Sequence, residues 1–221
     1  MNLQQIEDIT RQLLQSLPDH VTLVAAAKTR TVDEVKAAIR GGVKILGYNY
    51  VQEAEQICDE VGDGVQCHMI GHLQRNKVKR AINIFNMIET VDSLRLAQAL
   101  DHQCAESGIK MPFLIEINSG REENKTGILP QEVDEFVEKV SIYKNIQLQG
   151  LMTMGPMFGD PENARPYFKV TRNAFERLAK SAITNIDLRY ISMGMSNSYL
   201  IAIEEGANIV RIGTKLFGDR E

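Results

Sequence analysis

The sequence contains no tryptophan, only three cysteines and no long hydrophobic run. Cys58, Cys67 and Cys104 are odd in number and widely spaced, and no CxxC pair occurs. This pattern argues against a disulfide framework and against a zinc site. No segment approaches the length of a membrane span, and the N-terminus lacks the basic start of a signal peptide. These absences favour a protein of the reducing cytoplasm without membrane contact.

An excess of basic charge is also missing. The net charge is -4, and no basic block interrupts the chain, which argues against a mainly electrostatic nucleic-acid binder. At 221 residues, with 43% hydrophobic and 24% charged residues, the chain has the composition of an ordinary globular protein. We expect a single domain over residues 1–221.

Short apolar runs alternate with longer segments of helical period, which is the pattern of βα units. Runs without polar alternation, such as 112–117, indicate strands buried on both faces and hence a parallel sheet. An open doubly wound sheet is disfavoured because GxGxxG follows no strand. The sequence predicts an α/β fold, a (β/α)8 TIM barrel with an additional N-terminal helix that covers it where a final helix normally packs. A helix is expected after each strand but the last, and the expected strands are 21–28, 44–48, 65–70, 87–91, 111–117, 146–152, 188–193 and 208–213.

Lys28 stands at the end of the first expected strand, directly after the apolar run 21–27. Parallel sheets place functional side chains at the carboxyl ends of their strands. A lysine amine forms a Schiff base with an aldehyde cofactor or a carbonyl substrate. Because a lysine after a strand is more often a solvated surface residue, the rest of the chain has to decide its role.

Two turns near the C-terminus have the composition of phosphate-binding turns. In 193–197, Gly194 allows backbone N–H groups to face an anion, and Ser196 adds a hydroxyl. Gly213 and Thr214 end the eighth expected strand in the same way. Either turn alone is as consistent with a helix cap or an ordinary turn. The loops after strands seven and eight of TIM barrels commonly share a phosphate, so the pair predicts one phosphate site.

Arg211 lies within the eighth apolar run, where a buried charge requires a partner. The partner is either a carboxylate in a structural salt bridge or the pyridine nitrogen of an aromatic cofactor. Since arginine stays protonated, that nitrogen would not be protonated, and the cofactor would be a weakened electron sink.

Other polar residues follow the second, third and fifth expected strands. Asn49 suits a contact with a phosphate or a ring hydroxyl, and equally a helix cap. Lys125 suits an anion contact or a solvated loop charge. His68 and His72 have the i, i+4 spacing of a metal pair, but a strand separates such side chains by about 13 Å, so we expect no shared metal.

Six further segments have a specific pattern: AAAKTRT around Lys28, GYNYVQEA (47–54), HMIGHLQRNK (68–77), INSGREENKTG (117–127), GLMTM (150–154) and SMGMSNSYLIAIEEGANIVRIGTKLFG (192–218). By these segments the sequence resembles the YggS/PROSC family of pyridoxal 5'-phosphate (PLP) homeostasis proteins over nearly its whole length. Two positions depart from the family pattern: Tyr48, where an acidic residue is frequent, and Cys67, where an aromatic one is frequent.

The resemblance implies a fold type III PLP-binding barrel like the N-terminal domain of alanine racemase, without that enzyme's C-terminal β domain. It implies that Lys28 holds PLP as a Schiff base and that Arg211 faces the pyridine nitrogen. The cofactor-binding set that it implies is Lys28, Asn49, His72, Met193, Ser196, Arg211, Gly213 and Thr214.

The function implied is a monomeric carrier or regulator in vitamin B6 and amino-acid or keto-acid homeostasis, with apo PLP-dependent enzymes as acceptors. No catalytic residue is expected, because a racemase of this fold takes its second base from the separate β domain. Three alternatives stay open: an amino-acid racemase that uses Lys28 with Tyr48 or Lys125, a Schiff-base aldolase without cofactor, and a protein-binding module.

Overall fold

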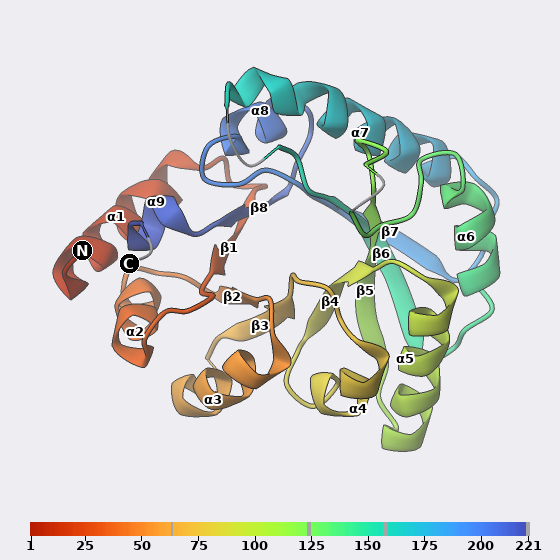
Figure 1. Cartoon of the computed structure of the whole chain (residues 1–221), viewed down its shortest axis with the longest axis horizontal. Helices are drawn as coiled ribbons and strands as arrows, with labels where there is room; N and C mark the ends of the chain where they lie inside the picture. Colours follow the sequence, from red (N-terminus) through yellow and green to blue (C-terminus); the bar gives the residue numbers. More distant parts are fainter. Residues whose placement is uncertain (63, 123–124, 157–158, 220–221) are drawn as a thin grey trace.

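The computed structural model describes residues 1–62, 64–122, 125–156 and 159–219. Within these ranges the strands form one closed parallel barrel in chain order, with β8 returning to β1 (Figure 1). The strands are β1 (Thr22–Ala26), β2 (Ile45–Tyr48), β3 (Gln66–Met69), β4 (Met87–Val91), β5 (Met111–Ile117), β6 (Ile146–Thr153), β7 (Ile186–Ser192) and β8 (Ile209–Ile212). The predicted (β/α)8 barrel is confirmed.

Helices surround the barrel in Figure 1. They are α1 (Leu3–Ser16), α2 (Val32–Arg40), α3 (Val51–Val61), α4 (Val78–Ala81), α5 (Leu94–Ser107), α6 (Val133–Val140), α7 (Arg165–Ala179), α8 (Tyr199–Glu204) and α9 (Thr214–Phe217), with 3-10 turns η1 (Arg75–Lys77) and η2 (Pro161–Ala164). The N-terminal helix α1 packs on α2 and α9. The expectation that no helix follows the eighth strand was wrong, because α9 does so.

Alternate strand residues face two separate apolar regions. Side chains such as Leu46 and Ile191 join helix residues in the large core between the barrel and its helices. Small clusters of strand residues, including Val24 with Ile209 and Leu114 with Met152, fill the barrel interior. Because β4 and β8 are buried at every position, their sequences show no polar alternation.

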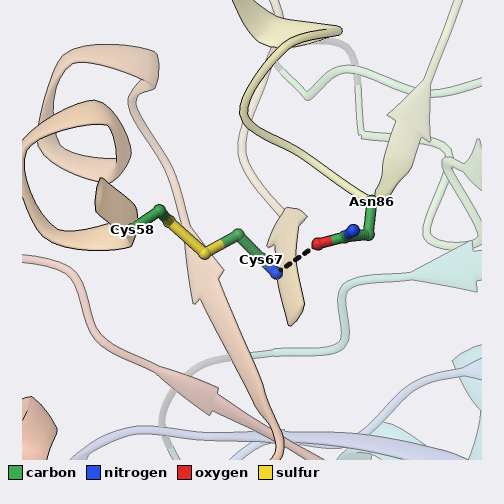
Figure 2. Close-up of a disulfide and its surroundings, with 3 residues drawn as sticks. All are labelled: Cys58, Cys67 and Asn86. Atoms are coloured by element: carbon green, nitrogen blue, oxygen red, sulfur yellow. Dashed lines mark hydrogen bonds between the residues drawn. A yellow bond between two sulfur atoms is a disulfide. The ribbon is translucent and has the colours of Figure 1, made fainter. Parts of the chain in front are cut away.

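The expectation of no disulfide was wrong, since Cys58 and Cys67 are bonded (Figure 2). Cys58 lies in the last turns of α3 and Cys67 near the start of β3, and their Cα atoms are 6.8 Å apart. The short connection folds the helix end back over the strand start, which the sequence spacing does not reveal. The backbone N–H of Cys67 also donates to Asn86 Oδ1 at 2.8 Å.

In the part of the chain that the structure describes, no helix combines the length and apolar character needed to cross a membrane.

Candidate functional site

Lys28 follows β1 at the carboxyl end of the barrel. Thr29 has a φ of +64°, a conformation that non-glycine residues rarely adopt and that turns the chain sharply after the lysine. Thr31 then caps α2 in a reciprocal capping box with Glu34. The half-buried Lys28 amine lies 5.1 Å from the centroid of the Tyr50 ring, and no described carboxylate forms an ion pair with it.

The two predicted phosphate turns meet at the same rim. Ser196 Oγ accepts hydrogen bonds from the backbone N–H groups of Gly213 and Lys215, both at 3.2 Å. A Cβ on Gly213 would lie 3.2 Å from the carbonyl oxygen of Ala26, two residues before Lys28. Thr214 follows as the exposed first residue of α9. The structure therefore brings the two turns together, next to the end of β1.

Gly194 allows the first of these turns to fold. Its φ is +93°, and a Cβ there would lie 2.5 Å from the Cβ of Ala202 in α8. Only glycine meets both conditions without strain.

Arg211 lies inside the barrel, 3% exposed. Its guanidinium donates to Ser192 Oγ at 2.6 Å and to the carbonyl oxygen of Thr153 at 2.8 Å, and contacts Met154 Sδ at 3.2 Å. Ser192 Oγ in turn donates to Glu89 Oε2 at 2.6 Å. The carboxylate predicted as a structural partner is thus present as Glu89, bridged to Arg211 by a serine hydroxyl.

Glu89 is fully buried and also accepts a hydrogen bond from His68 Nδ1 at 2.7 Å. Burial alone would raise the pKa of Glu89, but the hydrogen bond from His68 and the nearby positive charge of Arg211 hold it below the usual value. The His68 side chain is therefore buried inside the barrel, where its ring is bonded to Glu89. No group of three metal-binding side chains occurs among the described residues.

A cavity of about 360 Å³, here called the mouth cavity, opens over the barrel end. Residues that line it and that the sequence did not suggest include Thr90, Glu116, Met154 and Met195. Burial, and then the negative charge of Asp92, raises the pKa of Glu116. Side chains of a strand alternate between its two faces, so Glu116 shares a face with Leu114 of β5. The sequence therefore contained a signal that Glu116 faces the barrel interior.

Asn49 and His72 both line the mouth cavity. Asn49 lies against Gly71, where a Cβ would come within 2.6 Å of the Asn49 Cα atom and carbonyl oxygen. His72 Nδ1 is 2.8 Å from Asp92 Oδ2, which fixes the imidazole at the rim. Lys125 also lines the cavity, and its amine is 2.6 Å from Glu122 Oε1. Residues 123–124 of the predicted loop lie outside the described residues.

Two residues named from the sequence lie elsewhere. The side chain of Met193 is fully buried in the core between barrel and helices, so it does not reach the cavity. Tyr48 belongs to the same core, and its hydroxyl is buried without a partner among the described residues. Burial raises the pKa of Tyr48 far above its usual value, with a smaller contribution from Glu53.

The alanine racemase N-terminal domain model matches residues 1–221. The pyridoxal phosphate homeostasis protein of Aquifex aeolicus is 38% identical over 90% of this chain and 87% of that protein. The chain belongs to the pyridoxal phosphate homeostasis protein family. The human member is 34% identical over 90% of this chain and 76% of its own length.

Solved structures agree with this assignment. PipY of Synechococcus elongatus, solved with PLP bound, superposes with a TM-score of 0.88 at 29% identity, covering 96% of this chain and all of that one. Alanine racemase of Clostridium difficile has a TM-score of 0.78 at 18% identity and covers 99% of this chain. Only 56% of the racemase chain is matched, and at this identity the likeness shows the fold alone.

Proposed function

We propose that this family member binds PLP on Lys28 and acts in PLP homeostasis. The observation that carries the proposal is the contact between the two phosphate turns at the end of β1, with Ser196 bonded to Gly213 and Gly213 lying against Ala26. An anion held by these turns lies next to a half-buried primary amine. The relatives, which are pyridoxal phosphate homeostasis proteins, and the PLP-bound structure of PipY support the same cofactor.

The donors present fit each part of PLP. The hydroxyls of Ser196 and Thr214 would hold the phosphate, and the N–H of Gly213 would join them by exchanging its bond to Ser196 Oγ for one to the phosphate. Arg211 would donate to the pyridine nitrogen, because its guanidinium contacts Met154, which lines the mouth cavity. Asn49 and His72 would lie beside the ring at the opposite rim.

Bound PLP supplies an aldehyde that condenses with a primary amine. Lys28 provides that amine, and it has no carboxylate partner among the described residues to compete for it. Arg211 stays protonated in this position and gives the pyridine nitrogen a hydrogen bond while withholding a proton. The open rim around Asn49 and His72 admits water or an incoming amine.

We propose further that the protein turns over no substrate of its own. Racemisation needs a base on each face of the substrate carbon. Tyr48 faces the helix core with a raised pKa and is no candidate for the second base. Lys125 lines the mouth cavity and is the remaining candidate for the racemase alternative. Exchange of α-protons of amino acids in deuterated water at enzymatic rates would favour that alternative.

We propose a cytoplasmic monomer that passes PLP to apo enzymes. Sedimentation of the purified chain checks the first point, and reactivation of an apo PLP enzyme by the loaded protein checks the second. A dimer, or reactivation no faster than by the same concentration of free PLP, would contradict these proposals.

The deciding experiment uses the protein as purified with PLP added. We expect a visible absorption band that borohydride removes, and a reduced pyridoxyl-phosphate adduct on the peptide containing Lys28. Lys28→Ala removes the band and the adduct, whereas Lys36→Ala, an exposed lysine on the neighbouring helix α2, retains both. A colourless protein, or an adduct only on other lysines, would overturn the proposal.

A further inference from the structure

A second cavity, of about 320 Å³, lies outside the barrel rim between the start of α3 and the segment that leads from β3 into η1. We call it the Lys77 cavity. It shares Asn49 and His72 with the mouth cavity, and otherwise its polar lining comes from Tyr50, Gln52, Gln74 and Lys77. The two cavities thus lie on either side of one pair of residues.

The polar groups of the Lys77 cavity offer several hydrogen-bond donors and one cation. Amide side chains come from Asn49, Gln52 and Gln74, and the positive charge from Lys77. No aspartate or glutamate lines it among the described residues. Donors that converge with a cation and without a carboxylate favour an anion.

Lys77 is half-buried, and the described residues give it neither an ion pair nor a hydrogen bond through its amine. Arg80, one turn further on, contrasts with it because its guanidinium is paired with Glu55. A partly desolvated ammonium without a counter-charge is stabilised when an anion enters beside it. A single cation compensates one negative charge, as a carboxylate carries.

The size of the cavity limits the ligand. At roughly 30 Å³ for each water-sized group, it holds about ten non-hydrogen atoms. Met69 and Leu73 add an apolar wall suited to a short carbon chain. A nucleotide would therefore fit only in part and would extend out of the cavity.

We propose that the Lys77 cavity binds the carboxylate of a small organic acid. Tyr50 lines the cavity, and its ring also lies over the Lys28 amine at 5.1 Å. An organic acid held at Lys77 thereby lies against the same Tyr50 ring as the Lys28 amine, so the incoming amine or carbonyl compound is selected by its carboxylate. This last step rests on the proposed function, whereas binding of the anion does not.

The test uses butyrate as the anion and butyramide as its neutral counterpart, followed by amide chemical shifts of the full chain. We expect saturable shifts at Gln52 and Gln74 with butyrate and none with butyramide. Lys77→Gln weakens butyrate binding about five-fold or more, because the cation is half-buried. Lys79→Gln, an exposed lysine of α4 outside the cavity, leaves binding unchanged.

Gln74→Glu is the second variant, exposed and therefore tolerated by the fold, and it repels butyrate from the same cavity. Equal binding of butyramide, equal effects of the two lysine variants, absence of saturable shifts, or tighter binding of inorganic phosphate than of butyrate would each overturn the proposal. Lys28→Ala separates the anion site at Lys77 from the proposed binding of PLP on Lys28. If this variant no longer binds PLP but still binds butyrate, the anion site is supported independently. If PLP fails to bind the unaltered protein while butyrate binds, only the proposed function fails.

Discussion

The carboxylate of Glu89 lies 4.0 Å from the guanidinium of Arg211 in the interior of the barrel, and both side chains are shielded from water. Ser192 links them by accepting from Arg211 and donating to Glu89. The arginine that we propose as the donor to the cofactor nitrogen therefore has its counter-charge on β4, the strand across the barrel from β8.

Glu89→Gln leaves Arg211 buried without this counter-charge. We expect the free energy of unfolding in urea to fall by about 3 kcal/mol or more, since removing one partner of a buried pair strands the other charge. Glu138→Gln on the exposed face of α6 should change it by less than about 0.5 kcal/mol. Replacing both Glu89 and Arg211 by Met should cost less than Glu89→Gln alone. Equal stability of the two glutamine variants would contradict the role of the pair.

Glu116 gives the stability a defined pH dependence. Because its pKa is raised, the folded protein keeps this proton to a higher pH than the unfolded chain does. The free energy of unfolding therefore falls, through Glu116, as the pH rises from the ordinary glutamate pKa towards the raised pKa. Glu116→Gln should be more stable than the unaltered protein at about pH 7, with the difference vanishing below about pH 4. Urea titrations at both pH values measure it, and a difference independent of pH would refute the assignment.

Tyr48→Phe removes a buried hydroxyl that has no partner among the described residues. Since no hydrogen bond is lost and a desolvated polar group is removed, the free energy of unfolding should stay unchanged or rise by about 1 kcal/mol. PLP binding, followed by visible absorption, should also be unchanged. A loss of several kcal/mol, or of the cofactor band, would show that the phenol has a partner or a role that the structure does not reveal.

The disulfide should stabilise the fold without affecting the site, because Cys67 lies at the barrel end opposite Lys28. For a loop of nine residues, Cys58→Ser should lower the free energy of unfolding by about 2 to 3 kcal/mol. Unfolded without reductant, the protein should expose one thiol, that of Cys104, whose pKa burial raises to about 11 in the folded state. Three thiols in protein taken directly from cells would show that the bond is absent in its own compartment.

Much of the barrel was predictable because buried parallel strands leave apolar runs that periodicity detects. Each strand begins and ends within two residues of its expected limits. The rim residues Ser196 and Gly213 were predictable too, because a closed barrel brings the ends of neighbouring strands together. Cys58 and Cys67 were not, since their pairing depends on how a helix returns over its strand.

The pairing of the buried charges of Glu89 and Arg211 could not be predicted from the sequence. Nothing in the sequence around Glu89 indicates that its partner is Arg211, because β4 and β8 lie across the barrel from each other and do not pair. The side chain of Met193 was expected at the cofactor site but lies in the outer core, because of the alternation along β7. Tyr190 packs with the interior clusters and Ile191 with the outer core, so the alternation along β7 sends Met193 outwards.

Gly71 lies against Asn49, which lines both cavities. In Gly71→Ala the new Cβ would lie 2.6 Å from the Asn49 Cα atom and carbonyl oxygen, and backbone atoms yield less than the end of a flexible side chain. We expect a loss of about 1 to 3 kcal/mol in the free energy of unfolding, together with weaker PLP binding, because Asn49 is displaced from the rim.

Gly64→Ala is the matched control, since a Cβ there meets nothing within 4 Å. If Gly71→Ala unfolds at the same urea concentration as Gly64→Ala and binds PLP equally well, the close approach of Gly71 and Asn49 is not needed for the site. Loss of stability with unchanged PLP binding would instead show that Gly71 serves the fold alone, and would contradict the proposed contact between Asn49 and the cofactor.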